Sequence, residues 1–358
     1  MLPASQTLQS PATDSSAARE VKPQRSLLID IVRGLSISLV VLGHTNQGLI
    51  HRGRWGTSAT GLRLDTFIYA FHMPAFFFVS GIFLCASAEK RGGWRFTIEK
   101  LRTMIYPYLL LAFAFAPFAL LSRFSNSSAA NWRVYIESVA TGGFSWFLPT
   151  IFFVVVLGML LRRVPMPLLF VLSTIVSLYW PQTGLVFVDR GLEHLPFLVA
   201  GMWVGRSFEQ MERVPKILAA AAAAALFVSI AVLTEGRYAG SRYLFIPLGL
   251  LGTLMLMLAA RCLSRSASAR LLAWAGAGSL SIFLLSPFFQ WAGRQIVSRL
   301  LPATAPYPQL LIPTALAILL PAWIYHKRIR LHLGWIFLWP FKAGRQPEPG
   351  GQTLSAKP

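Results

Sequence analysis

DIVRGLSISLVVLGH, residues 30–44, is the most informative segment of the chain. It places an aspartate, an arginine and a histidine within an otherwise apolar run. At about 100° per residue in an α-helix, Asp30, Arg33 and His44 fall on one face, with His44 about 20° from Arg33 and roughly 16 Å further along the axis. Three ionisable side chains are therefore predicted to share one face of an apolar helix.

The surrounding run, residues 27–49, is long enough to cross a bilayer, because about 20 apolar residues at about 1.5 Å each span the hydrocarbon core. Ionisable groups at that depth cost about 3 kcal/mol each on insertion scales, and they usually face a bundle interior or a wet cavity. One interpretation is structural: an ion pair between Asp30 and Arg33, with His44 as a satisfied core histidine. We favour a functional site, since all three groups share one face.

The composition indicates a membrane protein. Of 358 residues, 55% are hydrophobic and only 13% are charged, which is more apolar surface than a soluble core of this size needs. The net charge of +20 does not indicate nucleic-acid binding, because the basic residues lie in short segments between apolar runs. Neither cysteine has a metal-ligand spacing, and no metal is expected. The predicted fold class is an all-α, polytopic membrane helix bundle of about ten transmembrane helices.

The order of apolar segments and basic loops predicts the topology. The predicted spans cover residues 27–49, 66–87, 104–121, a fourth ending at 162, then 168–188, 195–204, 217–233, 243–258, 271–297 and 310–325. Lys and Arg concentrate in the loops after the second, fourth, sixth and eighth spans. The positive-inside rule then predicts a multi-pass protein of the plasma (inner) membrane with both termini in the cytoplasm. Residues 26–340 form the membrane domain, and residues 1–25 and 341–358 are expected to be disordered cytoplasmic tails.

A second histidine is expected at the depth of the first. The segment FHMPAFFFVSG, residues 71–81, contains His72 and Pro74, and the proline should kink the helix and free a carbonyl group. Counted from the outer ends of the first two spans, His72 and His44 lie at nearly the same depth. Histidine readily takes and returns a proton near neutral pH. The alternative for His72 is a core histidine bonded to the carbonyl group that Pro74 frees.

Four segments together resemble a known family. They are RSLLIDIVRGLSISLVVLGH (25–44), FIYAFHMPAFFFVSG (67–81), KLRTMIYPYLL (100–110) and FSWFLPTIF (144–152). In this pattern the chain resembles the membrane acyltransferase-3 family, especially its fucose 4-O-acetylase-like branch. GAGSLSIFLLSP, residues 276–287, is similar to a late segment of the family.

The resemblance implies a reaction and its residues. The family transfers an acyl group, usually acetyl, from cytoplasmic acyl-CoA to a hydroxyl of a carbohydrate or similar acceptor across the bilayer. The partners would then be the lipid bilayer, acetyl-CoA (or another acyl-CoA) and that acceptor. The positions assigned are His44 as general base, Arg33 as orienter of the acyl-CoA, Asp30 as the partner of Arg33, His72 as the second histidine, and Trp146 with Phe147 on the acceptor side.

The basic loop EKRGGWRFTIEKLR, residues 89–102, suits the donor. Arg95, Lys100 and Arg102 are expected to hold the CoA phosphates through charge-assisted hydrogen bonds, together with Arg33. Two departures from the family stand out. Many relatives have a histidine where this chain has Ser286, and their paired arginines appear here only as Lys100 and Arg102, out of register with the following proline.

A secondary transporter or exporter is the main alternative. Buried Asp30, Arg33 and His44 can equally form a proton or substrate path. A transporter of this kind usually has two halves related by inverted topology, with paired broken helices. The sequence has no such repeat, and a non-catalytic scaffold would not require the three buried groups.

Overall fold

The computed structural model describes residues 27–121, 132–205, 210–211, 213–235, 241–264, 266–300 and 306–337. These residues form helices joined by turns, with no strand among them, which confirms the all-α class. The tails predicted at residues 1–25 and 341–358 lie outside the described residues.

In chain order, the helices are α1 (Leu27–Ile50), α2 (Thr60–Tyr69), α3 (His72–Ile82), α4 (Leu84–Arg91), α5 (Gly93–Lys100), the π-helical turn η1 (Leu101–Ile105), α6 (Tyr106–Leu121), α7 (Trp132–Thr141), α8 (Phe147–Leu161), α9 (Met166–Tyr179), α10 (Val186–Val204), α11 (Lys216–Thr234), α12 (Arg242–Leu263), α13 (Ala267–Ala277), α14 (Ser279–Leu300), α15 (Pro306–Lys327) and α16 (Gly334–Phe337).

Several of these helices can cross a membrane. Within the described ranges, five segments are long and apolar enough: α1, the run from α2 to α4, α11, α12 and α15. Helices α13 and α14 meet at an 84° bend and together make a sixth, broken span, which covers the span predicted at residues 271–297. The other predicted spans fall on shorter or more polar helices, α6 and α8 to α10. The chain is therefore a multi-pass membrane protein.

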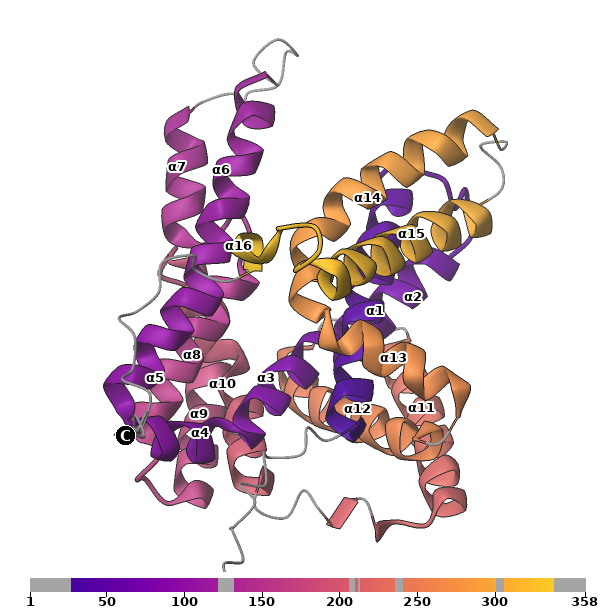
Figure 1. Cartoon of the computed structure of the whole chain (residues 1–358). Helices are drawn as coiled ribbons and strands as arrows, with labels where there is room; N and C mark the ends of the chain where they lie inside the picture. Colours follow the sequence, from indigo (N-terminus) through magenta and orange to yellow (C-terminus); the bar gives the residue numbers. More distant parts are fainter. Residues whose placement is uncertain are drawn as a thin grey trace, which may run out of the picture.

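Helix α1 packs against many other helices, and its contact with α13 is especially close. It lies against α2, α3, α12, α13, α14 and α15 (Figure 1). A Cβ atom on Gly34 would lie 2.0 Å from the carbonyl oxygen of Leu272, and one on Gly276 would lie 1.9 Å from that of Asp30. Small residues allow such backbone approach between membrane helices. Glycine is therefore required on both sides of this contact.

Helix α3 is held against α10 in the same way. A Cβ atom on Gly81 would lie 2.1 Å from the carbonyl oxygen of Leu198, and one on Gly201 would lie 2.0 Å from that of Phe78. In Figure 1, α3 runs between the group that contains α6 to α10 and the group that contains α1 and α11 to α15. The position of α3 therefore links the two groups.

The second predicted span is broken at a different place than expected. We expected a kink at Pro74, but the helix ends at Tyr69 and a new one begins at His72. Phe71 between them has φ −145° and ψ −13°, outside the helical region. Pro74 thus sits in the first turn of α3, where a backbone N–H has no intrahelical partner and its loss costs nothing. The break in the helix therefore lies about one turn before Pro74 in the sequence.

A π-helical turn, η1, lies between the basic residue Lys100 and Pro107. In η1 the N–H of Tyr106 donates to the carbonyl oxygen of Leu101, five residues earlier. Pro107 has no N–H to offer the preceding turn, and a single π turn inserts one extra residue into the helix. Lys100 and Arg102 are therefore rotated relative to the proline by comparison with an uninterrupted helix.

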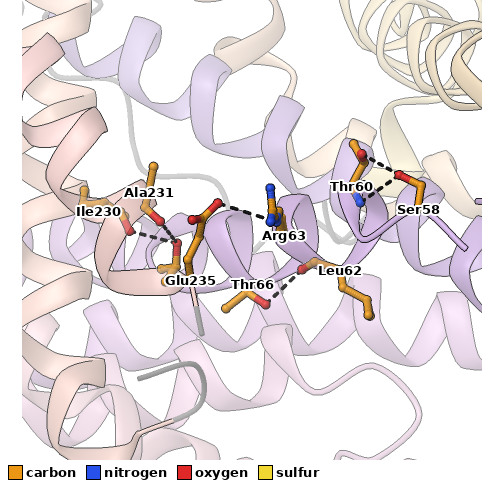
Figure 2. A network of polar contacts seen from close by, with 9 residues as sticks. Ser58, Thr60, Leu62, Arg63, Thr66, Ile230, Ala231 and Glu235 are labelled. Carbon is orange, nitrogen blue, oxygen red and sulfur yellow. Dashed lines mark hydrogen bonds and ion pairs between the residues drawn. The ribbon is translucent and has the colours of Figure 1, made fainter. Parts of the chain in front are cut away.

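Helix α2 is fastened to the end of α11 by the contacts in Figure 2. Arg63 and Glu235 form an ion pair with 3.6 Å between Nε and Oε1. Along each helix a threonine hydroxyl donates to a carbonyl of the preceding turn: Thr66 to Leu62, and Thr234 to Ile230. The threonine bonds lie within each helix, and of these contacts the ion pair is the one that joins α2 to the end of α11.

The close contact between α1 and α13 predicts that one methyl group added at Gly276 destabilises the protein. Gly276→Ala should lower the thermal midpoint of the purified protein in detergent, because forced overpacking costs about 1–3 kcal/mol and outweighs the roughly 1 kcal/mol that alanine gains in a helix. Gly278→Ala is the matched control, since its Cβ would find its nearest neighbour 3.4 Å away. Equal midpoints for the two variants would contradict the close contact.

Candidate active site

His44 lies in the last third of α1, and its ring is exposed rather than buried as the sequence led us to expect. Its Nδ1 lies 3.3 Å from the hydroxyl oxygen of Tyr69, the last residue of α2. A histidine that accepts a proton at Nε2 carries its hydrogen on Nδ1. In that tautomer Nδ1–H donates to the Tyr69 oxygen, so Tyr69 orients the ring for a base.

His72 is buried and has a defined tautomer. Its Nδ1 lies 2.7 Å from the carbonyl oxygen of Ile68, which can only accept a hydrogen bond, so Nδ1 carries the hydrogen and Nε2 a lone pair. The bonded carbonyl belongs to the last turn before the helix break. The ring packs edge-on against Tyr69, with 4.6 Å between centroids. Tyr69 therefore contacts both imidazoles.

Both imidazoles open onto the same space. His44, Tyr69, His72, Trp146 and Phe147 line a cavity of about 190 Å³, which we call the imidazole cavity. The structure thus brings the two histidines together with the aromatic pair that the sequence placed on the acceptor side.

A second cavity adjoins the first at His44. It measures about 340 Å³, and we call it the serine cavity, because Ser286 lines it together with Gln290. The Gln290 amide donates to the carbonyl of Val41 at 2.8 Å and to the hydroxyl of Thr45 at 3.1 Å, which fixes α14 against α1. The buried Ser286 hydroxyl forms no hydrogen bond with any described residue. Ser286 therefore faces the same space as His44.

Asp30 and Arg33 lie about three turns of α1 away from these cavities. Arg33 Nη1 is 4.0 Å from Asp30 Oδ1, a long ion pair in which Asp30 is buried and Arg33 half-buried. The two groups therefore share one face of α1 with His44 but stand near the opposite end of the helix.

Lys100, the last residue of α5, lies close to this pair. Burial lowers the pKa of the Lys100 ammonium, and the carboxylate of Glu99 partly offsets this effect. The positive charges of Arg91 and Arg33 lower the same pKa further. Arg33 and Lys100 are both half-buried, and their charges lie close enough to affect each other; we call these two residues the basic patch.

The other basic residues of the predicted donor site are less clearly placed. Arg95 is exposed on α5, and Arg102 is half-buried in η1. Neither forms an ion pair with a described residue. Arg91, in contrast, pairs with Glu99 at 3.0 Å. The charges of Lys100 and Arg33 therefore influence each other, whereas the described residues give no such link for Arg95 and Arg102.

A polar cavity that the sequence did not predict lies on the other side of Tyr69. It measures about 380 Å³, and its lining includes Tyr69, Trp180, Gln182, Asp189, Glu193 and Arg242. The span predicted at residues 195–204 begins earlier than expected, because α10 starts at Val186 and includes the segment DRGLEH, residues 189–194. Asp189 and Glu193 are spaced four residues apart and so share one helix face. This spacing of Asp189 and Glu193 is the feature of the sequence that could have predicted a polar helix face here.

Asp189 organises one wall of this polar cavity. Its carboxylate accepts hydrogen bonds from Trp180 Nε1 at 3.2 Å, from the Thr183 hydroxyl at 2.8 Å and from the backbone N–H groups of Thr183 and Gly184 at 3.0 Å each. It thereby closes the turn between α9 and α10. A carboxylate with this many donors is rigidly held.

A third imidazole, His194, was also missed. It is buried in α10, and its Nδ1 lies 2.8 Å from the carbonyl oxygen of Arg190. Its ring centroid lies 4.7 Å from that of Phe77 and 5.4 Å from that of Trp146. His194 therefore supports the wall behind Trp146. No group of three or more His, Cys, Asp or Glu that could hold a metal ion occurs within the described ranges.

These features define a membrane-embedded helical protein with an imidazole-lined cavity near one end of α1 and a basic patch near the other. The model of the acyltransferase 3 family, described as an acyltransferase domain, matches residues 27–326, and the chain belongs to this family. It is therefore an acyltransferase that transfers groups other than aminoacyl groups. No curated protein and no solved structure matches the chain.

The hydrogen bonds of Asp189 predict a loss of stability on substitution. Asp189→Asn replaces an oxygen acceptor by an NH₂ donor that faces other donors, and an unsatisfied buried polar group costs about 1–3 kcal/mol. We expect a lower thermal midpoint in detergent. Glu193 lines the same cavity, and Glu193→Gln breaks only a half-exposed ion pair with Arg190. This substitution should therefore have little effect on the thermal midpoint. A larger effect for Glu193→Gln would contradict this account.

Proposed function

We propose that the protein is an integral-membrane O-acyltransferase that moves an acetyl group from cytoplasmic acetyl-CoA to a hydroxyl of a carbohydrate acceptor at the far side of the membrane. In this proposal the chain acts as a member of the fucose 4-O-acetylase-like branch. It lies in the inner membrane with both termini in the cytoplasm, so His44 is on the outer side. The main support is the shared cavity of His44 and His72, about three helical turns from the basic patch.

His44 acts as the general base. Its Nε2 takes the proton of the acceptor hydroxyl, the oxygen attacks the thioester carbonyl, and the CoA thiolate leaves and is protonated. Such proton transfer contributes about 10²- to 10⁴-fold to a rate. In this tautomer Tyr69 accepts a hydrogen bond from Nδ1–H of His44, and His72, packed against Tyr69, keeps that tyrosine in place.

The basic patch holds the donor. Arg33 and Lys100 bind oxygen atoms of the CoA phosphates through charge-assisted hydrogen bonds, and Asp30 restricts the rotation of Arg33. Arg95 and Arg102 extend this positive surface along α5 and η1. The acyl end of the donor then extends toward His44, which lies roughly 16 Å from Arg33 along the axis of α1.

The acceptor approaches from the side of the polar cavity. An aromatic ring together with carboxylate, amide and guanidinium groups can bind a sugar, since rings cover its apolar face and the polar groups meet its hydroxyls. Trp180, Gln182, Glu193 and Arg242 provide these groups, and Tyr69 is common to this cavity and the imidazole cavity. Trp146 and Phe147 complete the wall of the imidazole cavity beside His44.

Loss of His44 should abolish the reaction without disturbing the fold. In proteoliposomes given labelled acetyl-CoA on one side and surface glycans on the other, the native protein should leave covalent acetyl on the glycan, and His44→Ala should leave about 10²-fold less or none. His332→Asn, at an exposed turn far along the chain, is the matched control and should remain active. Full activity of His44→Ala would exclude this mechanism, whereas movement of solute with no covalent acetyl would favour the transporter alternative.

Lys100 should affect donor binding more than chemistry. Lys100→Gln should raise the KM for acetyl-CoA about tenfold or more while kcat changes little, because a hydrogen bond to a charged group is worth about 1.5–3 kcal/mol. Arg163→Gln, which removes an exposed positive charge after α8, serves as the control. An unchanged KM in Lys100→Gln would remove this residue from the donor site.

A further inference from the structure

Three arginines gather at the end of α1 beyond His44. Arg52 and Arg54 come from the turn that follows α1, and Arg294 comes from α14. With Gln295, Ser298 and Gln309 they line a cavity of about 120 Å³, which we call the arginine cavity. None of its lining residues is acidic.

Two of the guanidinium groups point at the same place. A Cβ atom built on Gly48 would lie 3.2 Å from Nη2 of Arg52 and 3.6 Å from Nη1 of Arg294. Both groups therefore reach over the bare backbone of Gly48. Like charges repel, and the repulsion is larger where the surroundings are partly shielded from water.

Nothing in the described part of the chain neutralises this cluster. Arg52, Arg54 and Arg294 form no ion pair or hydrogen bond with any described residue. Arg63, also at this end of the protein, pairs with Glu235. Burial lowers the pKa of the Arg52 guanidinium, and the positive charge of Arg54 lowers it further. The cluster thus carries a positive potential that an external anion would relieve.

The residues that line the arginine cavity also provide hydrogen-bond donors suited to a phosphate group. One guanidinium group can donate two parallel hydrogen bonds to two oxygens of a phosphate. The Ser298 hydroxyl and the Gln295 amide, which line the same cavity, provide further donors. Its small volume suits a compact tetrahedral group rather than a sugar ring. Three cations around one cavity favour an anion that carries more than one negative charge.

We propose that the arginine cavity is a binding site for a phosphate or pyrophosphate group. The group belongs either to an anionic phospholipid or to a phosphorylated acceptor.

The arginine cavity lies close to His44 along two helices. Gly48 lies four residues after His44, and Arg294 lies four residues after Gln290, which lines the serine cavity with His44. Four residues of helix correspond to about 6 Å. A phosphate in the arginine cavity therefore sits about one helical turn from the imidazole, along both α1 and α14.

Binding of inorganic pyrophosphate tests the proposal without reference to acyl transfer. The full-length protein in a non-ionic detergent should bind pyrophosphate saturably by isothermal titration calorimetry. Arg294→Gln and Arg52→Gln should each weaken this binding at least tenfold, and Arg52, in an exposed turn, can be replaced with little risk to folding. Arg299→Gln, on α14 outside the cavity, should bind as the native protein does.

Absence of saturable binding, or equal weakening by Arg299→Gln, would overturn the proposal, whether or not the protein transfers acetyl groups.

Two further measurements identify the source of the phosphate. In the first, vesicles of phosphatidylglycerol compete with pyrophosphate while vesicles of phosphatidylcholine do not, which assigns the site to a lipid headgroup. In the second, a polyprenyl-pyrophosphate-linked sugar competes with pyrophosphate, which assigns the site to a phosphorylated acceptor. Arg294→Gln then raises the KM for this sugar as acceptor, and this measurement rests on the proposed function. Competition by either ligand supports a phosphate site, and competition by neither overturns it.

Discussion

The backbone contact between α1 and α13 is the constraint on which the arrangement of the polar groups depends. Gly34 and Gly276 let the two helices touch, and the carbonyl of Asp30 lies directly against Gly276. A helix held this closely cannot rotate about its axis. Asp30, Arg33 and His44 are therefore directed by packing rather than by their own interactions, and one rigid helix carries a cationic group near one end and an imidazole near the other.

The imidazole cavity depends on a second constraint, the break between α2 and α3. Because the chain leaves the helical conformation at Phe71, Tyr69 ends one helix and His72 begins the next. Tyr69 can then reach the His44 ring while its own ring covers His72. The close packing of α3 on α10 keeps this junction in place, and the same α10 carries His194 and Asp189.

Polar groups in this protein gather where helices end. The polar cavity lies among the ends of α2, α9 and α11 and the starts of α10 and α12, and the arginine cavity lies where α1 ends. This follows from the membrane environment, because the middle of each helix must be apolar while its ends lie near water and lipid headgroups. The serine and imidazole cavities have mainly apolar linings, with few polar residues.

Much of this could be predicted from residues near one another in the sequence. Helical periodicity alone places Asp30, Arg33 and His44 on one face, and composition alone indicates a membrane bundle, because both depend on local spacing and on the free energy of apolar transfer. Tyr69, His194 and the three arginines could not be found in this way. Their roles arise from contacts between distant segments, such as that of Gln290 with Val41, and from the break at Phe71, whose position depends on how α3 packs. Close packing of helices selects these neighbours, and no local pattern of residue types encodes it.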